Sequence, residues 1–506
     1  MGCARKGLYH TSPLAGDPQM LLTADSVIVQ AGKHYRRSGF HRLVFGRHYR
    51  EVWYAPVKAR VLHLDKEKGG LTVVKQGGSM QTLSLTLNDS AGAAYALRSV
   101  DKDPSGGLSP FLQKTFAADF LRDQTAALHP YAALVVAPLA EAAGIMQPSP
   151  ALYYLPNEQA VPEEFRAVAG DKVYLLEEKT SLKSLRAQGL SDANDLLSTK
   201  KMLKERYKQQ GQYVDETAFA KARLFDLFLN DRDRHDGQWE WAARKQNGHT
   251  VYLPVPEDRD QAFYNFSQGF IPEVFGDWFR YQKFTSFKGN YKNLKALLVK
   301  SKFMDNRLLS GVTETQFDSL AKSIQAQLTD DVLKHAVRNL PPPVYAVSGG
   351  TLLQKLQQRR DKLPELAKAY YQLLARKVII TGTNEAEIFK ITRLDDRNTL
   401  VEVFGSDGQE RMYSRVFETG QTQELVVYGL SGKDTFKVTG HVKKGIRLSI
   451  VGGTQTESYT VNASVRGAKR YTVIYDQQGK AGKLKAPDLK VARTRKAKAM
   501  AFDRKP

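Results

Sequence analysis

The sequence predicts an α+β fold in which a two-lobed domain is followed by a separate all-β domain. Three changes of pattern predict it. From Val57 onward, segments such as KARVLHLD and GLTVVKQGGSMQTLSLTLND alternate apolar and polar residues, as half-buried strands do. Residues 275–377 are then mainly helical in pattern. After Lys377 short alternating strands return, beginning with VIITG and AEIFKITRL. A β-rich lobe, a helical lobe and an all-β domain are therefore expected in that order.

These changes divide the chain into five expected segments. They are an N-terminal extension (1–56), a β-rich lobe (57–180), a helical lobe (181–377), an all-β domain (378–475) and a basic tail or linker (476–506). Inside the helical lobe, residues 190–230 are expected to be helical, and Asn247-Gly248 indicates the turn of a β-hairpin. In the all-β domain, GLSGKDTF and VGGTQTESY look like two related β turns.

The composition favours a folded protein with anionic partners. The chain has 506 residues, 42% of them hydrophobic, and a formal net charge of +22. Such a charge favours phosphates, nucleotides, nucleic acid or an anionic membrane face without choosing among them, and dispersed solvated lysine is the alternative explanation. No nucleic-acid recognition module is found, so no specific nucleic-acid partner is expected. The single cysteine, Cys3, excludes an intrachain disulfide, and no apolar run is long enough to span a bilayer.

A dense polar cluster, DRDRHDGQW, directly follows the apolar helical stretch AFAKARLFDLFLN. In it, Asp233-Arg234-His235 is followed by Gln238, and the hairpin then delivers Asp258-Arg259-Asp260. Phosphoryl transfer needs an Asp near the attacking hydroxyl, a side-chain amide and a second Asp for metal. Mg²⁺ prefers hard oxygen ligands, so carboxylates with an amide suit it.

This cluster resembles the catalytic parts of kinases. DRHDGQ is similar to the D-R-H-x-x-N catalytic loop of lipid kinases and their relatives, and PEDRDQAF is similar to the D-x-D-x-x-F segment of atypical secreted kinases, including the spore-coat kinase group. The resemblance implies a catalytic loop of Asp233, Arg234 and His235, with metal (Mg or Mn) held by Gln238, Asp258 and Asp260. Gln238, whose side chain is one methylene longer, stands where the family has Asn.

The upstream segments fit the same resemblance. KQGGSMQTLSLTL has Gly77 and Gly78 in a turn between two strands, as in a loop that covers nucleotide phosphates. The next strand carries Arg98 where kinases have Lys, with Lys102 just after it. An acid on the following helix should pair with this basic residue, and Asp123 is the candidate. The resemblance also implies an adenine-holding hinge around residues 176–178, including Glu177 and Glu178, for ATP or GTP.

Less specific interpretations remain open for the same residues. The neighbouring arginines and acids could form only a structural network, and a structural role is favoured for His235 because it has no zinc-type partner spacing. The alternative to an active phosphotransferase is a catalytically inactive kinase-like module that binds a ligand or a partner. Calcium binding by the all-β domain is not expected, because the second turn has Glu457 where a calcium β-roll repeat has Asp.

A second resemblance covers roughly residues 30–460. The order GRHYREVWYAPV, LRSVDKDP, DRDRHDGQW, DRDQAF and VYGLSGKDTF is similar to the middle region of large envelope proteins of Bacteroidota, which also carry a calcineurin-like phosphoesterase and an outer-membrane β-barrel. Together with Gly2-Cys3, which looks like the end of a lipoprotein signal, this implies a location in the cell envelope, in the periplasm or at the outer membrane. It also implies a barrel or phosphoesterase partner. The acceptor substrate cannot be named from the sequence.

Overall fold

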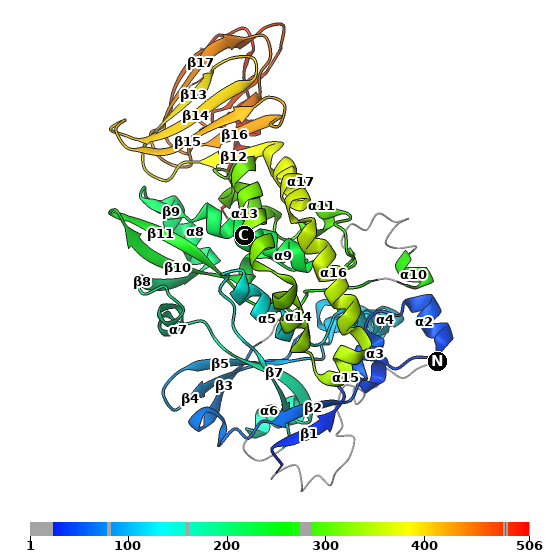
Figure 1. Cartoon of the computed structure of the whole chain (residues 1–506). Coiled ribbons are helices and arrows are strands. Elements are labelled where there is room, and N and C mark those ends of the chain that lie inside the picture. Colours follow the sequence, from blue (N-terminus) through cyan, green and yellow to red (C-terminus); the bar gives the residue numbers. More distant parts are fainter. Residues whose placement is uncertain are drawn as a thin grey trace.

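A computed structural model describes residues 24–77, 82–157, 161–266, 268–273, 285–478, 481 and 484–504. It has a β-rich N-terminal region, a helical middle region and an all-β C-terminal region, so the predicted α+β fold class is confirmed (Figure 1). Gly78, Gly2 and Cys3 lie outside the described residues.

A seven-stranded sheet forms the β-rich region. Its order is β1-β2-β6-β7-β5-β4-β3, and the strands are β1 (Ser26–Val29), β2 (Val57–Val61), β3 (Leu71–Gly77), β4 (Ser84–Asp89), β5 (Ala94–Ser99), β6 (Ala151–Leu155) and β7 (Lys172–Glu178). Every pair is antiparallel except β2 with β6. Leu85 and Leu87 alternate with more exposed residues on β4 and are buried, as the sequence pattern predicts. Strand β1 comes from the expected N-terminal extension, so part of that extension belongs to the sheet.

Short helices surround this sheet or follow it along the chain. They are α2 (Gly39–Phe45), α3 (Arg50–Trp53), α4 (Phe116–Gln124), α5 (Ala132–Ala142), α6 (Glu163–Ala169) and α7 (Leu182–Ala187). Helix α5 is buried on most of its surface and packs against α14 in the helical region. It therefore connects the two regions through one hydrophobic core.

The middle region also contains a four-stranded sheet. Its order is β8-β10-β11-β9, with β8 (Ala193–Ser198), β9 (Gln212–Val214), β10 (Trp239–Gln246) and β11 (His249–Pro256). The Asn247-Gly248 hairpin is confirmed, with positive φ at both residues. The expectation that 190–230 is all helical was wrong for β8 and β9, because pairing with the hairpin overrides the local pattern.

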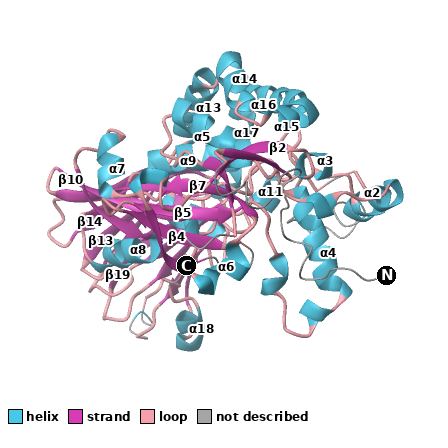
Figure 2. Cartoon of the chain, turned by 90° about the horizontal axis from the view of Figure 1, so that it is seen from below, coloured by secondary structure: helices cyan, strands magenta, loops and turns pink. Residues whose placement is uncertain are grey.

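The remaining middle region is helical. Its helices are α8 (Thr199–Lys208), α9 (Glu216–Leu229), α10 (Phe270–Glu273), α11 (Leu294–Leu297), α12 (Lys302–Leu308), α13 (Glu314–Gln327), α14 (Asp330–Arg338), α15 (Pro342–Val344), α16 (Gly350–Asp361) and α17 (Leu363–Ala375). Helices α13, α14 and α16 lie together on one side of the molecule (Figure 2). Pro341 precedes α15, where proline is tolerated because the first turn needs no N–H donor. None of the described helices is long and apolar enough to cross a bilayer.

Two five-stranded sheets form the C-terminal region. One has the order β12-β16-β18-β20-β21 and the other β15-β14-β13-β17-β19. The strands are β12 (Lys377–Thr381), β13 (Glu387–Arg393), β14 (Asn398–Gly405), β15 (Arg411–Glu418), β16 (Glu424–Tyr428), β17 (Thr435–Val442), β18 (Arg447–Val451), β19 (Ser458–Val465), β20 (Thr472–Tyr475) and β21 (Leu489–Val491). The chain passes from one sheet to the other and back, and successive passes pair in parallel. This region is therefore a coil of stacked passes.

Equivalent side chains stack between these passes. The rings of Phe389 and Phe436 lie 4.7 Å apart and nearly parallel, and Tyr459 stacks on Phe436 at 5.4 Å. The two related turns of the sequence thus occupy equivalent places in consecutive passes.

The expected basic tail is partly structured. Strand β21 pairs with β20, and helix α18 (Thr494–Ala499) packs on the same strand. The interpretation of 476–506 as a tail or linker was wrong for these two elements, because Ala497 of α18, together with Ala492 just after β21, covers the last pass.

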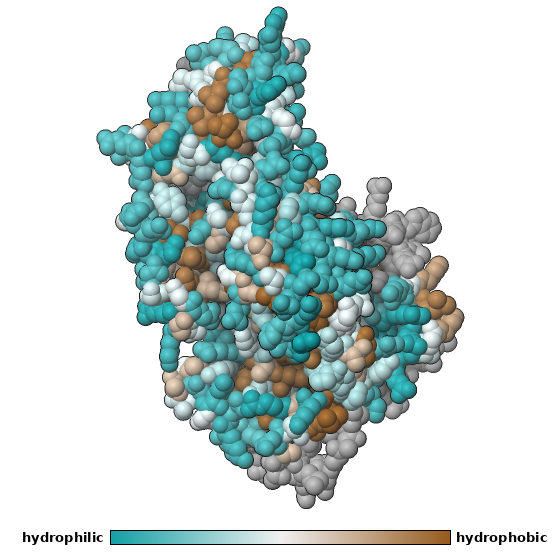
Figure 3. All heavy atoms as spheres, viewed as in Figure 1, coloured by the Kyte–Doolittle hydropathy of each residue, from teal (hydrophilic) through white to brown (hydrophobic). Residues whose placement is uncertain are grey.

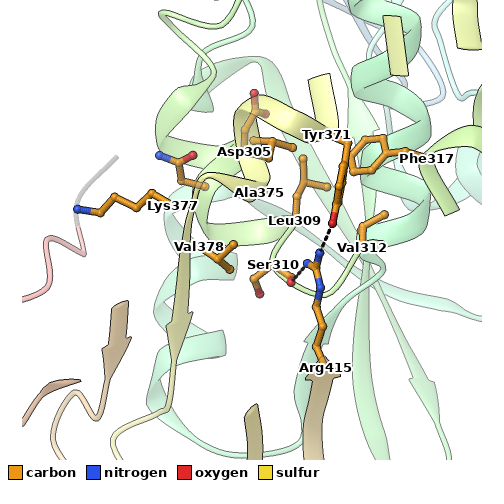
Figure 4. Close-up of a pocket in the computed structure, with 12 residues that line it drawn as sticks. Asp305, Leu309, Ser310, Val312, Phe317, Tyr371, Ala375, Lys377, Val378 and Arg415 are labelled. Carbon is orange, nitrogen blue, oxygen red and sulfur yellow. Dashed lines mark hydrogen bonds between the residues drawn. The ribbon is translucent and has the colours of Figure 1, made fainter. Parts of the chain in front are cut away.

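The C-terminal region docks directly on the helices. Arg415 of β15 donates to the carbonyl of Ser310 and, at 3.1 Å, to the hydroxyl of Tyr371 on α17 (Figure 4). Tyr413 donates to the same carbonyl at 2.9 Å. Only Arg376 separates α17 from β12, so the junction has no long connecting loop.

Over the surface that Figure 3 presents, hydrophilic residues predominate and hydrophobic atoms form separate small groups.

Candidate functional site

The candidate site begins at the C-terminal end of helix α9. Asp215 caps its N-terminus by accepting from Ala218 N at 2.8 Å. Asn230 ends the helix in the left-handed conformation. The buried guanidinium of Arg359 donates to the carbonyls of Leu227 and Phe228, each at 2.6 Å. These bonds satisfy acceptors that a helix end otherwise leaves free, and so fix the loop that follows.

A buried ion network lies beneath this loop. Asp226 is fully buried and pairs with Arg223 at 2.7 Å, Arg259 at 2.8 Å and Arg234 at 3.3 Å. Burial opposes its ionisation, but the three arginines together lower the pKa of Asp226. Sequence reasoning missed Asp226, although its place one turn before the end of an apolar helix is a signal, because an acid there needs a partner.

Arg234 joins the two Asp-containing loops. It is fully buried and donates to the backbone carbonyls of Glu257 at 2.6 Å and Asp258 at 2.8 Å. It also donates to the side-chain oxygen of Gln238 at 3.1 Å. Arg234 was expected in the catalytic loop, and its contacts are structural. The Gln238 oxygen that was expected to hold metal faces a guanidinium instead, which disfavours a second cation at that atom.

Asp233 and His235 occupy the exposed side of the same loop. Asp233 pairs with Lys300, whose side chain is 53% exposed, and retains 18% exposure of its own. His235 accepts from Gly237 N at 3.0 Å and caps a short 3-10 turn. This is a structural contact, as the alternative interpretation of His235 expected.

Arg98 on strand β5 meets acids from two directions. It donates to Glu177 on the adjacent strand β7 at 2.7 Å and to Asp258 at 3.3 Å. Although burial opposes it, the two carboxylates raise the pKa of Arg98. Asp258 sits at a φ of 45°, a backbone conformation that non-glycine residues rarely adopt.

Lys102, just after β5, is the second basic residue of the site. Its ammonium pairs with Asp260, and its side chain is only 8% exposed. Burial lowers the pKa of Lys102, while the charges of Asp258, Asp233 and Asp231 raise it and that of Arg98 lowers it. Both Asp loops therefore act electrostatically on one ammonium group, which brings the predicted acids and bases together.

Asp123 does not pair with Arg98, and that part of the prediction was wrong. Its carboxylate binds the buried Arg50 at 2.9 and 2.6 Å, with Arg37 and His41 at 3.2 and 3.1 Å. Burial opposes ionisation, but the hydrogen bond and charge of Arg50 lower the pKa of Asp123 to about 2. The sequence did not indicate this pair, because Arg50 and Asp123 are 73 residues apart along the chain.

Two further predicted residues stay apart from these contacts. Glu178 is exposed, because consecutive strand residues face opposite sides of a sheet and Glu177 takes the inner one. Gly77 ends strand β3.

The ion pairs of Arg98 and Lys102 lie at a small cavity between the seven-stranded sheet and the helical region. Its volume is about 40 Å³. The lining includes the charged residues Arg98, Lys102, Glu177, Asp258, Arg259 and Asp260, and on the apolar side Trp53, Leu128, Ala132 and Leu175. Asp233 and Gln238 are not among the lining residues. The cavity is below the range of about 300–1,000 Å³ for sites that hold drug-sized ligands, so a nucleotide requires the ion pairs to part.

Within the described part of the chain, no three His, Cys, Asp or Glu side chains are grouped closely enough to hold a metal ion by themselves. Three carboxylates line the cavity, and of these Asp258 and Asp260 come from the loop that follows β11, while Glu177 is paired with Arg98 on the sheet. Mg²⁺ is commonly held by one or two carboxylates together with substrate phosphates and waters, so this donor set fits Mg²⁺ only with a phosphate ligand beside it.

No protein-family model matches the chain, and no curated protein matches it. Among solved structures, a Helicobacter pylori proinflammatory kinase, CtkA, aligns with 57% of this chain and 93% of its own at 9% identity and a TM-score of 0.29. HipA of Shewanella oneidensis MR-1, solved with HipB and operator DNA, aligns over 59% and 67% at 10% identity and 0.29. The Rio2 kinase of Chaetomium thermophilum, solved with ADP and Mg²⁺, aligns over 51% and 70% at 15% identity and 0.21.

Proposed function

We propose that the chain is an atypical kinase-like phosphotransferase that uses ATP or GTP with Mg²⁺ or Mn²⁺. The observation that carries this proposal is the gathering of two strand-side cations, Arg98 and Lys102, with Asp258 and Asp260 around one cavity. Phosphoryl transfer depends on positioning the reactants and stabilising their charge more than on covalent chemistry. A basic residue that faces an Asp able to bind metal supplies both.

Each residue takes a role that its surroundings support. Arg98 and Lys102 would bind nucleotide phosphates once their carboxylate partners turn to a metal. Asp258 and Asp260 would hold that metal, which would neutralise charge on the phosphates. Asp233, partly exposed beside the cavity, would orient the acceptor hydroxyl. Arg234 and Asp226 would hold the two loops in register without touching the reactants.

A thermal shift experiment tests the proposal. ATP and GTP are each added with and without Mg²⁺ or Mn²⁺, and a ligand that binds only the folded state raises the melting temperature. We expect a rise with nucleotide and metal together in the wild type, and its loss in Asp260→Asn. The matched control is Asp318→Asn, since Asp318 makes an exposed pair with Lys322 far from the cavity. No rise under any condition, or a rise that survives Asp260→Asn, would overturn the proposal.

A non-catalytic kinase-like module is the second candidate, and one observation favours it. Lys102, Arg98 and Lys300 already neutralise Asp260, Asp258 and Asp233, so the acids are satisfied without metal. This candidate predicts nucleotide binding without turnover, or none. Measuring nucleotide hydrolysis with the thermal shift separates the two candidates.

A location in the cell envelope is a further part of the proposal. It rests on the Gly2-Cys3 pair and on the resemblance to Bacteroidota envelope proteins, including their barrel and phosphoesterase neighbours. Fractionation of the native organism, with the native full-length protein followed by antibody, tests it, and recovery in the cytosol alone would contradict it.

A further inference from the structure

A second cavity, of about 260 Å³, lies away from the candidate site. It is bounded by the α2–α3 connection, by Asn265 and Gln268 and by helix α16, and Figure 1 draws α3 beside α15 and α16. None of its lining residues lines the first cavity. Its volume is below the usual range for drug-sized ligands, about 300–1,000 Å³, and suits a compact ligand.

The charges around this cavity are unbalanced. Among its described lining residues, Arg42, Arg47, Arg50 and Lys355 are basic and only Glu51 is acidic. Glu51 pairs with Arg42 at 3.2 Å, and Arg50 pairs with Asp123, which is not one of the lining residues. Within the described residues, Arg47 and Lys355 have no acidic partner within 4.0 Å.

Contacts with neighbouring residues hold the segment between α2 and α3, which carries Arg47, in place. His48 is 8% exposed and is held between the carbonyl of Asn265 and the side chain of Gln124, each at 3.1 Å. Burial, with the charge of Arg50, lowers the pKa of His48 to about 4, so it is neutral near pH 7. Gly46 has a φ of 100°, and a Cβ there would lie 2.4 Å from the His48 ring, so only glycine permits this packing. Arg47, next to His48 along the chain, therefore lies on a segment that is held in place at the cavity.

The excess of positive charge affects the pKa of Lys355. Burial and the positive charges of Lys288 and Arg359 lower its pKa, and no carboxylate opposes them. Arg359 is itself buried against carbonyls and aromatic rings with no carboxylate among its contacts in the described chain. A cleft lined by charge of one sign attracts counter-ions, and guanidinium and ammonium groups bind phosphate well.

We propose that this cavity binds the phosphate group of a small anionic ligand, with Arg47 and Lys355 as its principal contacts. The proposal does not depend on the nucleotide site, because the two cavities share no residue. Inorganic phosphate, pyrophosphate and glycerol 3-phosphate carry the same chemistry, and comparing them distinguishes an inorganic from an organic source.

Isothermal titration calorimetry on the full chain, without nucleotide or divalent cation, tests the proposal with these three probes. We expect one site in the wild type, weakened about tenfold by Lys355→Gln and by Arg47→Gln, since each removes one charge-assisted contact. Lys368→Gln is the matched control, because Lys368 is exposed on α17 away from both cavities. Arg47 is exposed, so its variant should fold even if that of Lys355 does not.

Three outcomes would overturn the proposal. One is the absence of binding by all three probes. Another is binding that neither Lys355→Gln nor Arg47→Gln weakens. The third is binding that is lost instead in Lys102→Gln, which would assign the phosphate to the first cavity. Loss of nucleotide binding in Asp260→Asn concerns only the proposed function and leaves this result unaffected.

Discussion

Asp226 and Asp233 are close in the sequence, but their surroundings predict different consequences when the charge is removed. Asp233 pairs with a lysine that is half exposed, and exposed pairs contribute about 0–1 kcal/mol. We therefore expect Asp233→Asn to keep the stability of the wild type and, under the proposed function, to reduce phosphoryl transfer by about 100-fold or more, the usual contribution of a positioned acid or base. Thermal melts and nucleotide turnover measure the two effects. A drop of the melting temperature with turnover unchanged would contradict the expectation.

Asp226→Asn should instead destabilise the protein. The substitution leaves Arg223, Arg234 and Arg259 without their shared buried partner, and breaking a buried pair costs about 3–5 kcal/mol. Urea unfolding followed by tryptophan fluorescence measures the loss, with Asp233→Asn as the control of equal chemistry. An unchanged unfolding midpoint would show that the network is not a source of stability.

The motif order along the chain was sufficient to select Arg98, Lys102, Asp258 and Asp260, which the structure gathers. It could not supply their partners. Glu177 reaches Arg98 through strand pairing, and Asp226 meets Arg234 and Arg259 where the loops after α9 and β11 come together, and neither contact leaves a local pattern. The spacing of Gln238 likewise says nothing about Arg234, which donates to its side-chain oxygen.

At the scale of elements, the C-terminal strands are connected by a row of buried acids. Glu387 N donates to Asp434 at 2.9 Å, and Asp434 N donates to Glu457 at 2.8 Å, so each acid accepts from the equivalent residue of the preceding pass. The sequence pattern indicated the two turns in GLSGKDTF and VGGTQTESY, but not the equivalent turn that ends at Glu387. The β14–β15 hairpin separates that turn from the next one along the chain, and hides the repeat spacing.

This row predicts that stability falls as the pH rises. Burial raises the pKa of Asp434 to about 9 and that of Glu457 to about 7, with Glu387 and Asp476 as neighbouring acids. The folded state therefore holds more protons than the unfolded chain, whose Asp pKa is about 3.9, and the contribution of these acids to stability is lost between about pH 4 and 9. Calorimetric melting of the wild type and Asp434→Asn from pH 5 to 9 checks this. The variant should gain in melting temperature relative to the wild type as the pH rises, and a constant difference would contradict the assignment.

At the scale of the whole molecule, the all-β region has its own hydrophobic core, yet it is fastened to the helices. The switch of pattern at Lys377 predicted the start of β12, because periodicity changes where the element type changes. The docking could not be predicted, since Arg415 and Tyr371 lie on separate elements whose relative placement only the packed structure determines.

The docking contacts should control access to the junction between α17 and β12. Arg415→Ala removes two hydrogen bonds of a guanidinium that is 8% exposed. A loss of about 1.4 kcal/mol in closing the junction, which is modest for bonds to a charged group, would raise the open population about tenfold. Cleavage by trypsin after Arg376 or Lys377 should accelerate by the same factor, provided that reclosing is faster than cleavage. Arg411→Ala is the control from the same strand, because Arg411 is 59% exposed and, among the residues that the structure describes, forms its ion pair with Glu402 at the surface. If both variants are cut at the wild-type rate, the Arg415 contacts do not hold the two regions together, and their association rests on other contacts, such as the hydrogen bonds of Gln210 to Ala386 and Glu387.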